Sequence, residues 1–387
     1  MSPSTRNEFL VDLSLVQEEV RSGVVPAYSI KKDGHWNIWL EYCRTHKLDP
    51  FLHGIKDKVA ILQVFGRRFR VGKIAPRGKR VMSKSVQDAV RSVGQGFTVL
   101  GADDPRHASD GKIDLRLKRQ FRSYKKEDRP SIQVKPLPIC IIMAIVAHSA
   151  RPSTSEHAKS LANLVCIAFF FLLRPGEYTG TVTDDQAFSL DDITLYVHSR
   201  RLSNQHSTDE ELLSATNLTL TFTTQKNMNN GQTIAHARSG HPMCCPVLAT
   251  VRQLLMHRHV LRLHGRAYKG STKLASIYSP TGKNVPLRAS DFTTTIRLFA
   301  ATKRTVTGVS PSEYSARSLR AGGAMALMAG KCDDNIIKLL GRWRSDAMMD
   351  YLHEQSLPIF KRLAGVMYNN GHHSFLPSET VPILAVG

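Results

Sequence analysis

Residues 314–354 read YSARSLRAGGAMALMAGKCDDNIIKLLGRWRSDAMMDYLHE, and this stretch decides the fold of the C-terminal half. Arg317 and Arg320 are three residues apart, so they share one face of a predicted helix. Small residues follow and allow another helix to pack closely. A second helix, with isoleucines and leucines on its core face, ends at Gly341. Tyr351 follows ten residues later, on a third predicted helix.

A second arginine-bearing segment lies upstream, in FFFLLRPGEYTG, residues 169–180. Arg174 stands at the end of an apolar helix, immediately before Pro175 and Gly176, which terminate that helix. The guanidinium is therefore held at a helix end and faces a turn. Taken alone, this arginine fits a structural ion pair with Glu177 equally well.

Two segments between these motifs alternate apolar and polar residues as strands do. They are DDITLYV, residues 191–197, and TNLTLTFTTQK, residues 216–226, which places Lys226 where a strand enters an Asn/Gly turn. The rest of the second half reads as helices, and the first half reads as four or five helices. The predicted fold class is mainly α with a small antiparallel β-sheet.

The motifs LLRPGEY, TTQKN, SLRAGGA and LLGRWRSDAMMDY resemble, in order and spacing, the tyrosine recombinases of the phage-integrase type. Within that family they are most similar to the Crypton-like and DIRS-like recombinases of eukaryotic mobile elements. The resemblance covers about residues 136–360. The N-terminal half is similar to the helical core-binding domain of the family only in charge, length and position.

The resemblance implies a role for each matching residue. Arg174 and Arg320 would clamp a DNA phosphate, and Tyr351 would be the nucleophile that becomes joined to DNA. Guanidinium groups suit such a clamp because they bind phosphate oxygens through two parallel hydrogen bonds and stay charged. Lys226 would be the general acid for the leaving 5′ oxygen. Glu177 would orient the arginines.

One further position departs from the family pattern, and another matches it. Arg317 stands where histidine or lysine is usual, and an arginine donates hydrogen bonds but cannot act as a base near neutral pH. Trp343 matches the family's histidine or tryptophan shortly after Gly341, while Arg342 is the residue nearest that glycine. The indole N–H of Trp343 would donate to a phosphate oxygen, and its ring would pack the helix of Tyr351.

The charge of the chain favours a polyanionic partner. It has 53 Lys and Arg against 32 Asp and Glu, a formal charge of +21. Double-stranded DNA is the leading candidate, although a membrane surface or simple solubility would give a similar total. One basic run contains eight cations and no acid, and its residues are predicted to contact DNA phosphates; the alternative is a solvated loop. These residues are Arg67, Arg68, Arg70, Lys73, Arg77, Lys79, Arg80 and Lys84.

A length of 387 residues with 42% apolar content predicts two domains. We expect a helical, basic DNA-binding domain over 1–130, a catalytic domain over 136–365 and a tail over 366–387. Prolines and charges near 128–138 mark the linker between the domains.

Several classes of protein are excluded by what the sequence lacks. No apolar stretch approaches the roughly 18 residues of a membrane span, and the N-terminus does not read as a secretory signal. No C-x-x-C pair occurs, and His241 with Cys244 gives the one hint of metal-ligand spacing. We therefore expect reduced cysteines, no metal and no cofactor. The expected location is the nucleus in a eukaryote, or otherwise the cytoplasm beside DNA.

The family works as a tetramer on two duplexes, with a C-terminal segment of one protomer docking on the next, so we expect a homotetramer on DNA and a monomer when free. The apolar tail SETVPILAVG, residues 378–387, suits that docking. Three alternatives remain. They are a catalytically impaired, domesticated DNA-binding protein, a type IB topoisomerase, and an unrelated basic RNA-binding or structural protein.

Overall fold

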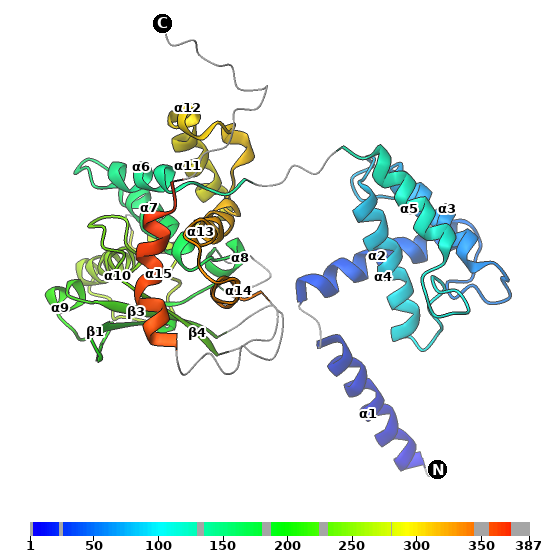
Figure 1. The fold of residues 1–387 in the computed structure, drawn as a ribbon. Helices are drawn as coiled ribbons and strands as arrows, with labels where there is room; N and C mark the ends of the chain where they lie inside the picture. Colours follow the sequence, from blue (N-terminus) through cyan, green and yellow to red (C-terminus); the bar gives the residue numbers. More distant parts are fainter. Residues whose placement is uncertain are drawn as a thin grey trace, which may run out of the picture. The chain divides into compact units, whose positions relative to one another are not determined.

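The chain divides into two compact units, Met1–Ser131 and Ile132–Gly387, in the computed structural model (Figure 1). Each unit has its own hydrophobic core. The structure describes residues 3–22, 26–129, 135–179, 187–223, 231–279, 281–343 and 356–372.

The first unit is helical throughout its described elements. Helix α4 packs against three neighbours, α2, α3 and α5. The core is aromatic, with the Trp39 and Phe65 rings meeting edge to face at 5.2 Å, and the Trp39 indole donating to the Pro50 carbonyl at 3.0 Å. The helices are α1 (Pro3–Ser22), α2 (Pro26–Thr45), α3 (Lys58–Arg70), α4 (Ser83–Val99) and α5 (Leu115–Glu127).

The second unit combines helices with two small sheets. Its helices are α6 (Ile139–Ser149), α7 (Glu156–Phe170), α8 (Pro175–Tyr178), α9 (Asp209–Leu213), α10 (Pro246–Leu263), α11 (Ala289–Thr302), α12 (Arg304–Thr307), α13 (Ser318–Ala329), α14 (Asp334–Gly341) and α15 (Ser356–Asn369), with the 3-10 helices η1 (Leu190–Asp192) and η2 (Pro311–Glu313). Its strands are β1 (Ile193–Val197), β2 (Arg200–Leu202), β3 (Asn217–Phe222), β4 (Gln232–Ala237), β5 (Ser276–Tyr278) and β6 (Asn284–Pro286).

The larger sheet is antiparallel, with strand order β2-β1-β3-β4. In β3 every second residue is buried, which is the pattern of a strand with one face on the core. Leu220 faces Ile193 of β1 on one side and Ile234 of β4 on the other. Helix α15 contacts β4 (Figure 1). The remaining strands, β5 and β6, form a separate two-stranded hairpin.

Helix α7 is the centre of the second unit. Residues 160–170 are all buried, because α6, α10, α11 and α13 pack around this helix; a helix that is apolar on every side belongs in a core. Two glycines let α13 approach closely. A Cβ atom at Gly322 would overlap the backbone of Leu137, and one at Gly323 would overlap the carbonyl oxygen of Phe169.

The predicted fold class is confirmed: the protein is mainly α-helical with a small antiparallel sheet. The predicted stop at Gly341 is also confirmed, since α14 ends there and Asp333 caps its start by accepting from the Asn335 N–H at 2.8 Å. The predicted helix carrying Tyr351 lies outside the described residues. In the described part of the chain, no helix combines the length and apolarity of a membrane span.

The six cysteines are all free thiols. Four of them, Cys43, Cys166, Cys244 and Cys245, are buried, whereas Cys140 and Cys332 are half-buried. Burial raises the pKa of the Cys43 thiol to about 12. These buried cysteines therefore act as small apolar core residues.

Candidate active site

The candidate site lies where α7 and α14 end. The last carbonyls of a helix have no partner within that helix, and they form the negative end of its dipole. Arg320, on α13, bonds with one guanidinium to the last carbonyl of α14 and to a carbonyl two residues beyond α7. Its Nη1 donates to the Leu172 carbonyl at 2.8 Å, and its Nη2 donates to the Gly341 carbonyl. Arg320 therefore holds the two helix ends together.

Arg342 occupies the residue after α14 and has a left-handed backbone, with φ of 55°. Its N–H donates to the Leu339 carbonyl at 3.1 Å, and the Trp343 N–H donates to the Lys338 carbonyl at 3.0 Å. This pair of bonds is a Schellman-type helix end, and glycine is the usual residue at its left-handed position. The Arg342 side chain turns inward and is only 2% exposed.

The buried guanidinium of Arg342 donates to three backbone carbonyls. Nη1 donates to Phe171 at 3.2 Å and Leu340 at 2.9 Å, and Nη2 donates to Leu172 at 3.2 Å. Two of these carbonyls follow α7, and the third belongs to α14. Arg342 thus reinforces the same junction that Arg320 spans.

Glu177 links the arginines. It lies in the short helix α8, and its Oε2 accepts the backbone N–H of Arg174 at 2.7 Å, while its Oε1 accepts from the Arg174 guanidinium at 2.9 Å. The same Oε2 accepts from Nη2 of Arg342 at 2.8 Å. The side chain of Glu177 is 14% exposed and that of Arg174 is 36% exposed. Arg174 is therefore the more solvent-facing partner of this carboxylate.

The arginine cluster, defined as Arg174, Arg320 and Arg342, carries more positive charge than Glu177 neutralises. Burial, together with the charges of Arg174 and Arg342, lowers the pKa of Arg320 to about 9. Burial likewise lowers the pKa of Arg342 to about 10. Both groups remain protonated at neutral pH. Three cations and one carboxylate leave a formal charge of +2, so the cluster is suited to bind an anion.

Two aromatic rings complete the packing. The Trp343 ring lies 4.5 Å from Cζ of Arg320, and the Phe222 ring lies 4.0 Å from Cζ of Arg342. Both distances are within the range of cation–π attraction. Phe222 is the last residue of β3, so the strand that precedes Lys226 ends at the arginine cluster.

The structure brings together four of the predicted site residues, namely Arg174, Glu177, Arg320 and Trp343. It does not bring in Arg317, which is the exposed residue before α13 and whose side chain has no bonding partner among the described residues. Lys226 and Tyr351 lie outside the described residues.

Sequence reasoning gave no role to Arg342, which the structure places in the cluster. One signal was present: a long cation directly follows the glycine that ends an apolar helix. A residue there begins next to helix carbonyls, which favour a cation.

The basic run between Arg67 and Lys84 does not act as a uniform surface. Arg70 is buried, donates to both Asp128 and the Val81 carbonyl, and lies over the Tyr124 ring. A guanidinium held in this way cannot reach DNA, so Arg70 is removed from the predicted contacts. Arg80 pairs with Glu127 at 2.6 Å but stays exposed. Arg68 is half-buried, and the other five cations are exposed.

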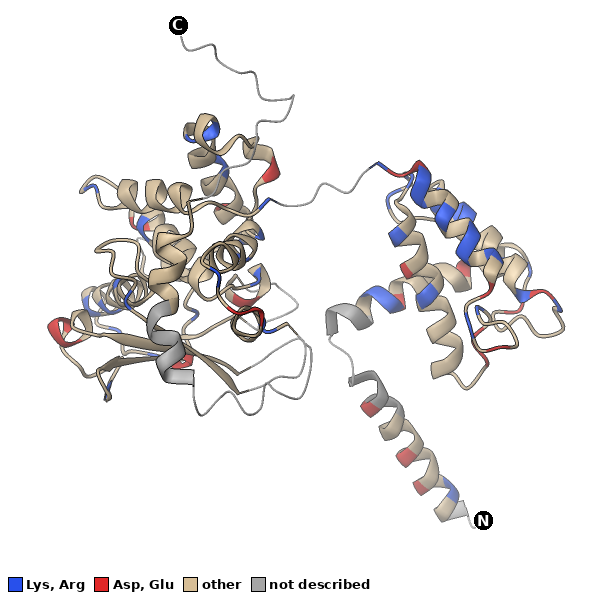
Figure 2. Cartoon of the chain, in the orientation of Figure 1, with Lys and Arg blue, Asp and Glu red and all other residues tan. Residues whose placement is uncertain are grey.

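Helix α5 presents a second basic surface, here called the α5 stripe. At 100° per residue its members fall within roughly one third of the helix circumference. All of them are exposed, and none has an ion-pair partner among the described residues, whereas Arg116 on another face pairs with Asp57 and Asp114. Figure 2 shows the blue residues along this helix. The α5 stripe consists of Lys118, Arg119, Arg122, Lys125 and Lys126.

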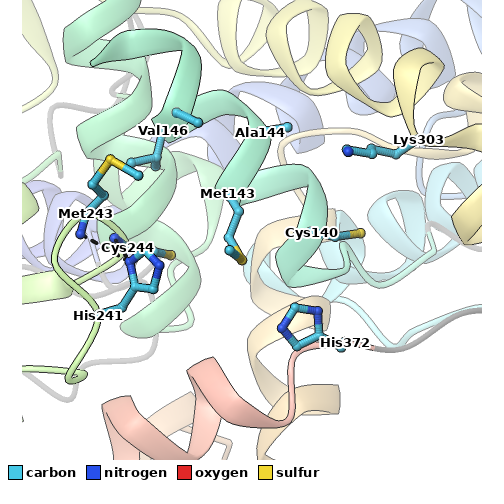
Figure 3. A pocket seen from close by; sticks show the side chains of 10 residues that line it. Cys140, Met143, Ala144, Val146, His241, Met243, Cys244, Lys303 and His372 are labelled. Carbon is cyan, nitrogen blue, oxygen red and sulfur yellow. Dashed lines mark hydrogen bonds between the residues drawn. The ribbon is translucent and has the colours of Figure 1, made fainter. Parts of the chain in front are cut away.

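A separate cavity of about 320 Å³ lies in the second unit, beside α6 (Figure 3). Its lining is largely apolar and sulfur-containing, with Cys140, Met143 and Met243 among the residues. His241 faces it, but Nδ1 of that ring accepts the backbone N–H groups of Met243 and Cys244 at 3.1 and 2.9 Å. The ring nitrogen Nδ1 of His241, the histidine whose spacing from Cys244 suggested a metal ligand, is therefore already bonded to the backbone of its own loop.

No protein-family model matches this chain, and no curated protein matches it. Among solved structures, it is similar to a fragment of the Tn1549 transposon integrase in complex with circular intermediate DNA, at 12% identity and a TM-score of 0.40, over 82% of this chain and 94% of that one. A variant of that integrase fragment with transposon right end DNA gives 10% identity and a TM-score of 0.36, over 84% and 99% of the two chains. These likenesses are too distant to assign a fold family or an activity.

Proposed function

We propose that this chain is a DNA strand-cutting and rejoining enzyme of the tyrosine recombinase type. The observation that supports this most directly is the arginine cluster, in which three guanidinium groups and one carboxylate meet at two helix ends. A phosphodiester attacked by an oxygen acquires extra negative charge on its phosphoryl oxygens. Fixed guanidinium groups stabilise that charge without reorganising during the reaction.

In the proposed reaction, the phenolic oxygen of Tyr351 forms a bond to phosphorus and gives up its proton to solvent water, since Arg317 cannot accept it. The bond from phosphorus to the 5′ oxygen breaks, and that oxygen takes a proton from Lys226. The products are a 3′-phosphotyrosine link and a free 5′ hydroxyl. A 5′ hydroxyl of another strand then attacks the link and reverses the step, so the covalent intermediate conserves the bond energy and no ATP is consumed.

The proposed partner is double-stranded DNA, held by cations of both units. In the first unit these are the exposed members of the basic run, of which Arg80 is paired with Glu127, and the α5 stripe, whose unpaired charges suit phosphate contacts. The motif order further supports a recombinase of a Crypton-like or DIRS-like mobile element, acting as a homotetramer on DNA. The need to reach DNA places its proposed site of action in the nucleus of a eukaryote.

The rival with support of its own is a domesticated DNA-binding protein without catalysis. Arg317 favours it, because the structure leaves this side chain exposed and an arginine cannot act as a base near neutral pH. The enzyme and this rival differ in one observable, a covalent link between protein and DNA.

The test is to incubate the protein with nicked suicide duplexes from a sequence library and to look for a covalent adduct on a denaturing gel. We expect an adduct in the parent and none in Tyr351→Phe. Tyr368→Phe is the matched control, since the Tyr368 ring lies 4.5 Å from the His241 ring, tilted against it, and belongs to no part of the arginine cluster. It should form the adduct at the parental rate.

Binding of these duplexes without any adduct would favour the domesticated protein, and Arg317→His would then be the first reversion to make. An adduct that survives in Tyr351→Phe would reject the proposed nucleophile. With an adduct established, exchange between two duplexes would identify a recombinase, and relaxation of a supercoiled plasmid alone would identify a topoisomerase.

A further inference from the structure

We propose that Arg342 is a positioning residue that fixes the Arg174 guanidinium by way of Glu177. The contacts of Arg342 stand by themselves, but the effect on DNA cleavage rests on the proposed function. The role assigned to Arg342 is therefore to hold Glu177 in place, and it follows from the hydrogen bonds of Arg342 rather than from its charge or its burial alone.

Arg342 does not face a substrate. It is 2% exposed, and its two terminal nitrogens make four hydrogen bonds within the protein, three to carbonyls and one to Glu177. Its Nε is buried and has no partner among the described residues. A guanidinium enclosed in this way can affect the site only by positioning the carbonyls and the carboxylate to which it is bonded.

Glu177 passes the constraint to Arg174. One carboxylate oxygen accepts both from Arg342, at 2.8 Å, and from the Arg174 backbone N–H, at 2.7 Å. The other oxygen accepts from the Arg174 side chain at 2.9 Å. The carboxylate is thus fixed from its buried side by Arg342. It in turn fixes the backbone and one terminal nitrogen of Arg174, whose remaining side-chain nitrogens bond to no described residue.

The choice of arginine at this position has a geometric reason. A single planar fork reaches Phe171, Leu340, Leu172 and Glu177 together, which requires several donors directed in one plane. Lysine offers three donors from a point charge, and histidine offers two. Only arginine supplies both the positive charge and the fork.

The backbone at Arg342 gives an independent indication. Residues with a side chain are disfavoured at φ of 55°, and glycine is the common residue at such a helix end. Unfavourable conformations persist where the surrounding structure holds them, and they gather at functional sites. Here the left-handed turn is what directs the side chain of Arg342 back toward Glu177.

The experiment is a double-mutant cycle of Arg342→Gln and Glu177→Gln, measured as the rate constant of adduct formation at saturating duplex. Each single variant should lower that rate constant by about 10- to 100-fold, which is the cost of misplacing a catalytic group. The double variant should be no slower than the slower single variant, because both changes release the same guanidinium. The duplex concentration at half-saturation should stay within about twofold of the parental value, since the distant cations set affinity.

Arg258→Gln is the matched control. Arg258 is a mostly buried arginine of the same unit that binds the Ser207 carbonyl at 2.8 Å and approaches Asp209 at 3.4 Å. Arg258→Gln should lower the stability of the protein and leave the rate constant of adduct formation unchanged.

Should Arg342→Gln fail to fold, Arg342→Lys replaces it as the test. It keeps the charge and most of the volume, and it should still form the adduct more slowly than the parent. Multiplicative losses in the double variant, or a parental rate constant in Arg342→Lys or in a folded Arg342→Gln, would overturn the inference.

A second readout separates this inference from the proposed function. Sulfate should raise the melting temperature of the parent, and Arg342→Gln and Glu177→Gln should each need more sulfate for half of that rise, with no further increase in the double variant. A parent that forms no adduct but follows this pattern would remove the enzymatic proposal and leave the positioning role intact. Equal sulfate responses in parent and Arg342→Gln would reject the role.

Discussion

The positive charge of Arg320 lowers the stability of the folded protein. Its pKa is lowered to about 9, well below the ordinary value of an arginine, by burial and by two neighbouring guanidinium groups. Below pH 9 the group is protonated in both the folded and unfolded chain, so the folded state bears the whole penalty. The penalty is relieved as pH rises above about 9, where the unfolded chain still binds the proton and the folded chain does not. A bound anion would relieve it at neutral pH.

This linkage predicts the pH dependence of anion binding. Sulfate keeps one charge state between pH 7 and pH 10.5, so a change in its effect reports on the protein. The rise in melting temperature that sulfate causes should be full at pH 7 to 8 and should decline above about pH 9, as Arg320 loses its proton.

Thermal unfolding with and without sulfate, at several pH values, measures this decline. Arg320→Gln supplies the baseline, because sulfate also stabilises proteins generally through exclusion from their surface. After subtraction of that baseline, a sulfate effect that stays constant to pH 10.5 would rule out Arg320 as the titrating group.

At the scale of single residues, the sequence singled out the arginines that stand in motifs and did not reveal the arginine contacts that depend on distant partners. Arg174 and Arg320 stand in recognisable motifs at helix ends. Arg342 joins them because its backbone is left-handed and because the carbonyls after α7 lie beside it, and neither fact can be read from neighbouring letters. The prediction that Arg70 contacts DNA was wrong for the same reason, because its partner Asp128 is 58 residues away in the sequence.

At the scale of elements, the position of Arg320 depends on how closely α13 approaches the end of α7. Gly323 removes the side chain that would strike the Phe169 carbonyl, and Gly322 does the same against Leu137. Both glycines lie on α13, one turn or less from Arg320. The spacing between the helices therefore sets where the guanidinium meets Leu172.

We expect Gly323→Ala to lower the free energy of unfolding by about 1 to 3 kcal/mol, the range for overpacking a closed contact. It should also slow adduct formation, because α13 must move away from the carbonyls that hold Arg320. Urea denaturation and the adduct assay measure the two effects.

Gly34→Ala is the control for this substitution. Gly34 lies within α2, and a Cβ there meets nothing within 4 Å. Alanine at this helical position should raise stability by about 0.5 to 1 kcal/mol. If Gly323→Ala behaves like Gly34→Ala, the close approach of α13 does not position Arg320.

Most helices and strands could be predicted from the sequence, because the spacing of apolar residues that indicates them lies within a short segment. Alternation placed β1 and β3. The basic segment that forms α5 is visible in the sequence, and the apolar residues Leu117, Phe121 and Tyr124 recur at helical spacing along its buried face. Leu117 is buried and the cations of the stripe are exposed, and this separation arises from packing against α3 and α4.

At the scale of the whole molecule, positive charge is spread over both units. Residues 1–135 carry 27 Lys and Arg against 15 Asp and Glu, and residues 136–387 carry 26 against 17. On the proposed function, binding of DNA should release many counterions, so the affinity should fall steeply with salt.

The α5 stripe should contribute measurably to that salt dependence. We expect the combined change of Lys118→Gln, Arg122→Gln and Lys125→Gln to reduce the slope of log affinity against log salt by about 3, near one unit for each phosphate that the stripe no longer neutralises. Fluorescence anisotropy with a labelled duplex at several salt concentrations gives the slope.

Arg116→Gln is the control within the same helix, since Arg116 is already paired with Asp57 and Asp114. Its slope should match the parental slope. An unchanged slope in the triple variant would mean that the stripe faces solvent when DNA is bound.

The distribution of thiols makes the chain a convenient substrate for site-directed labelling. With four cysteines buried, Cys140→Ser and Cys332→Ser remove the two that reagents reach most readily. A cysteine introduced by Lys125→Cys on the exposed side of α5 would then be the main target for a photoactivatable cross-linker. The nucleotides captured by that probe would record, base pair by base pair, where the helix comes to rest along a duplex.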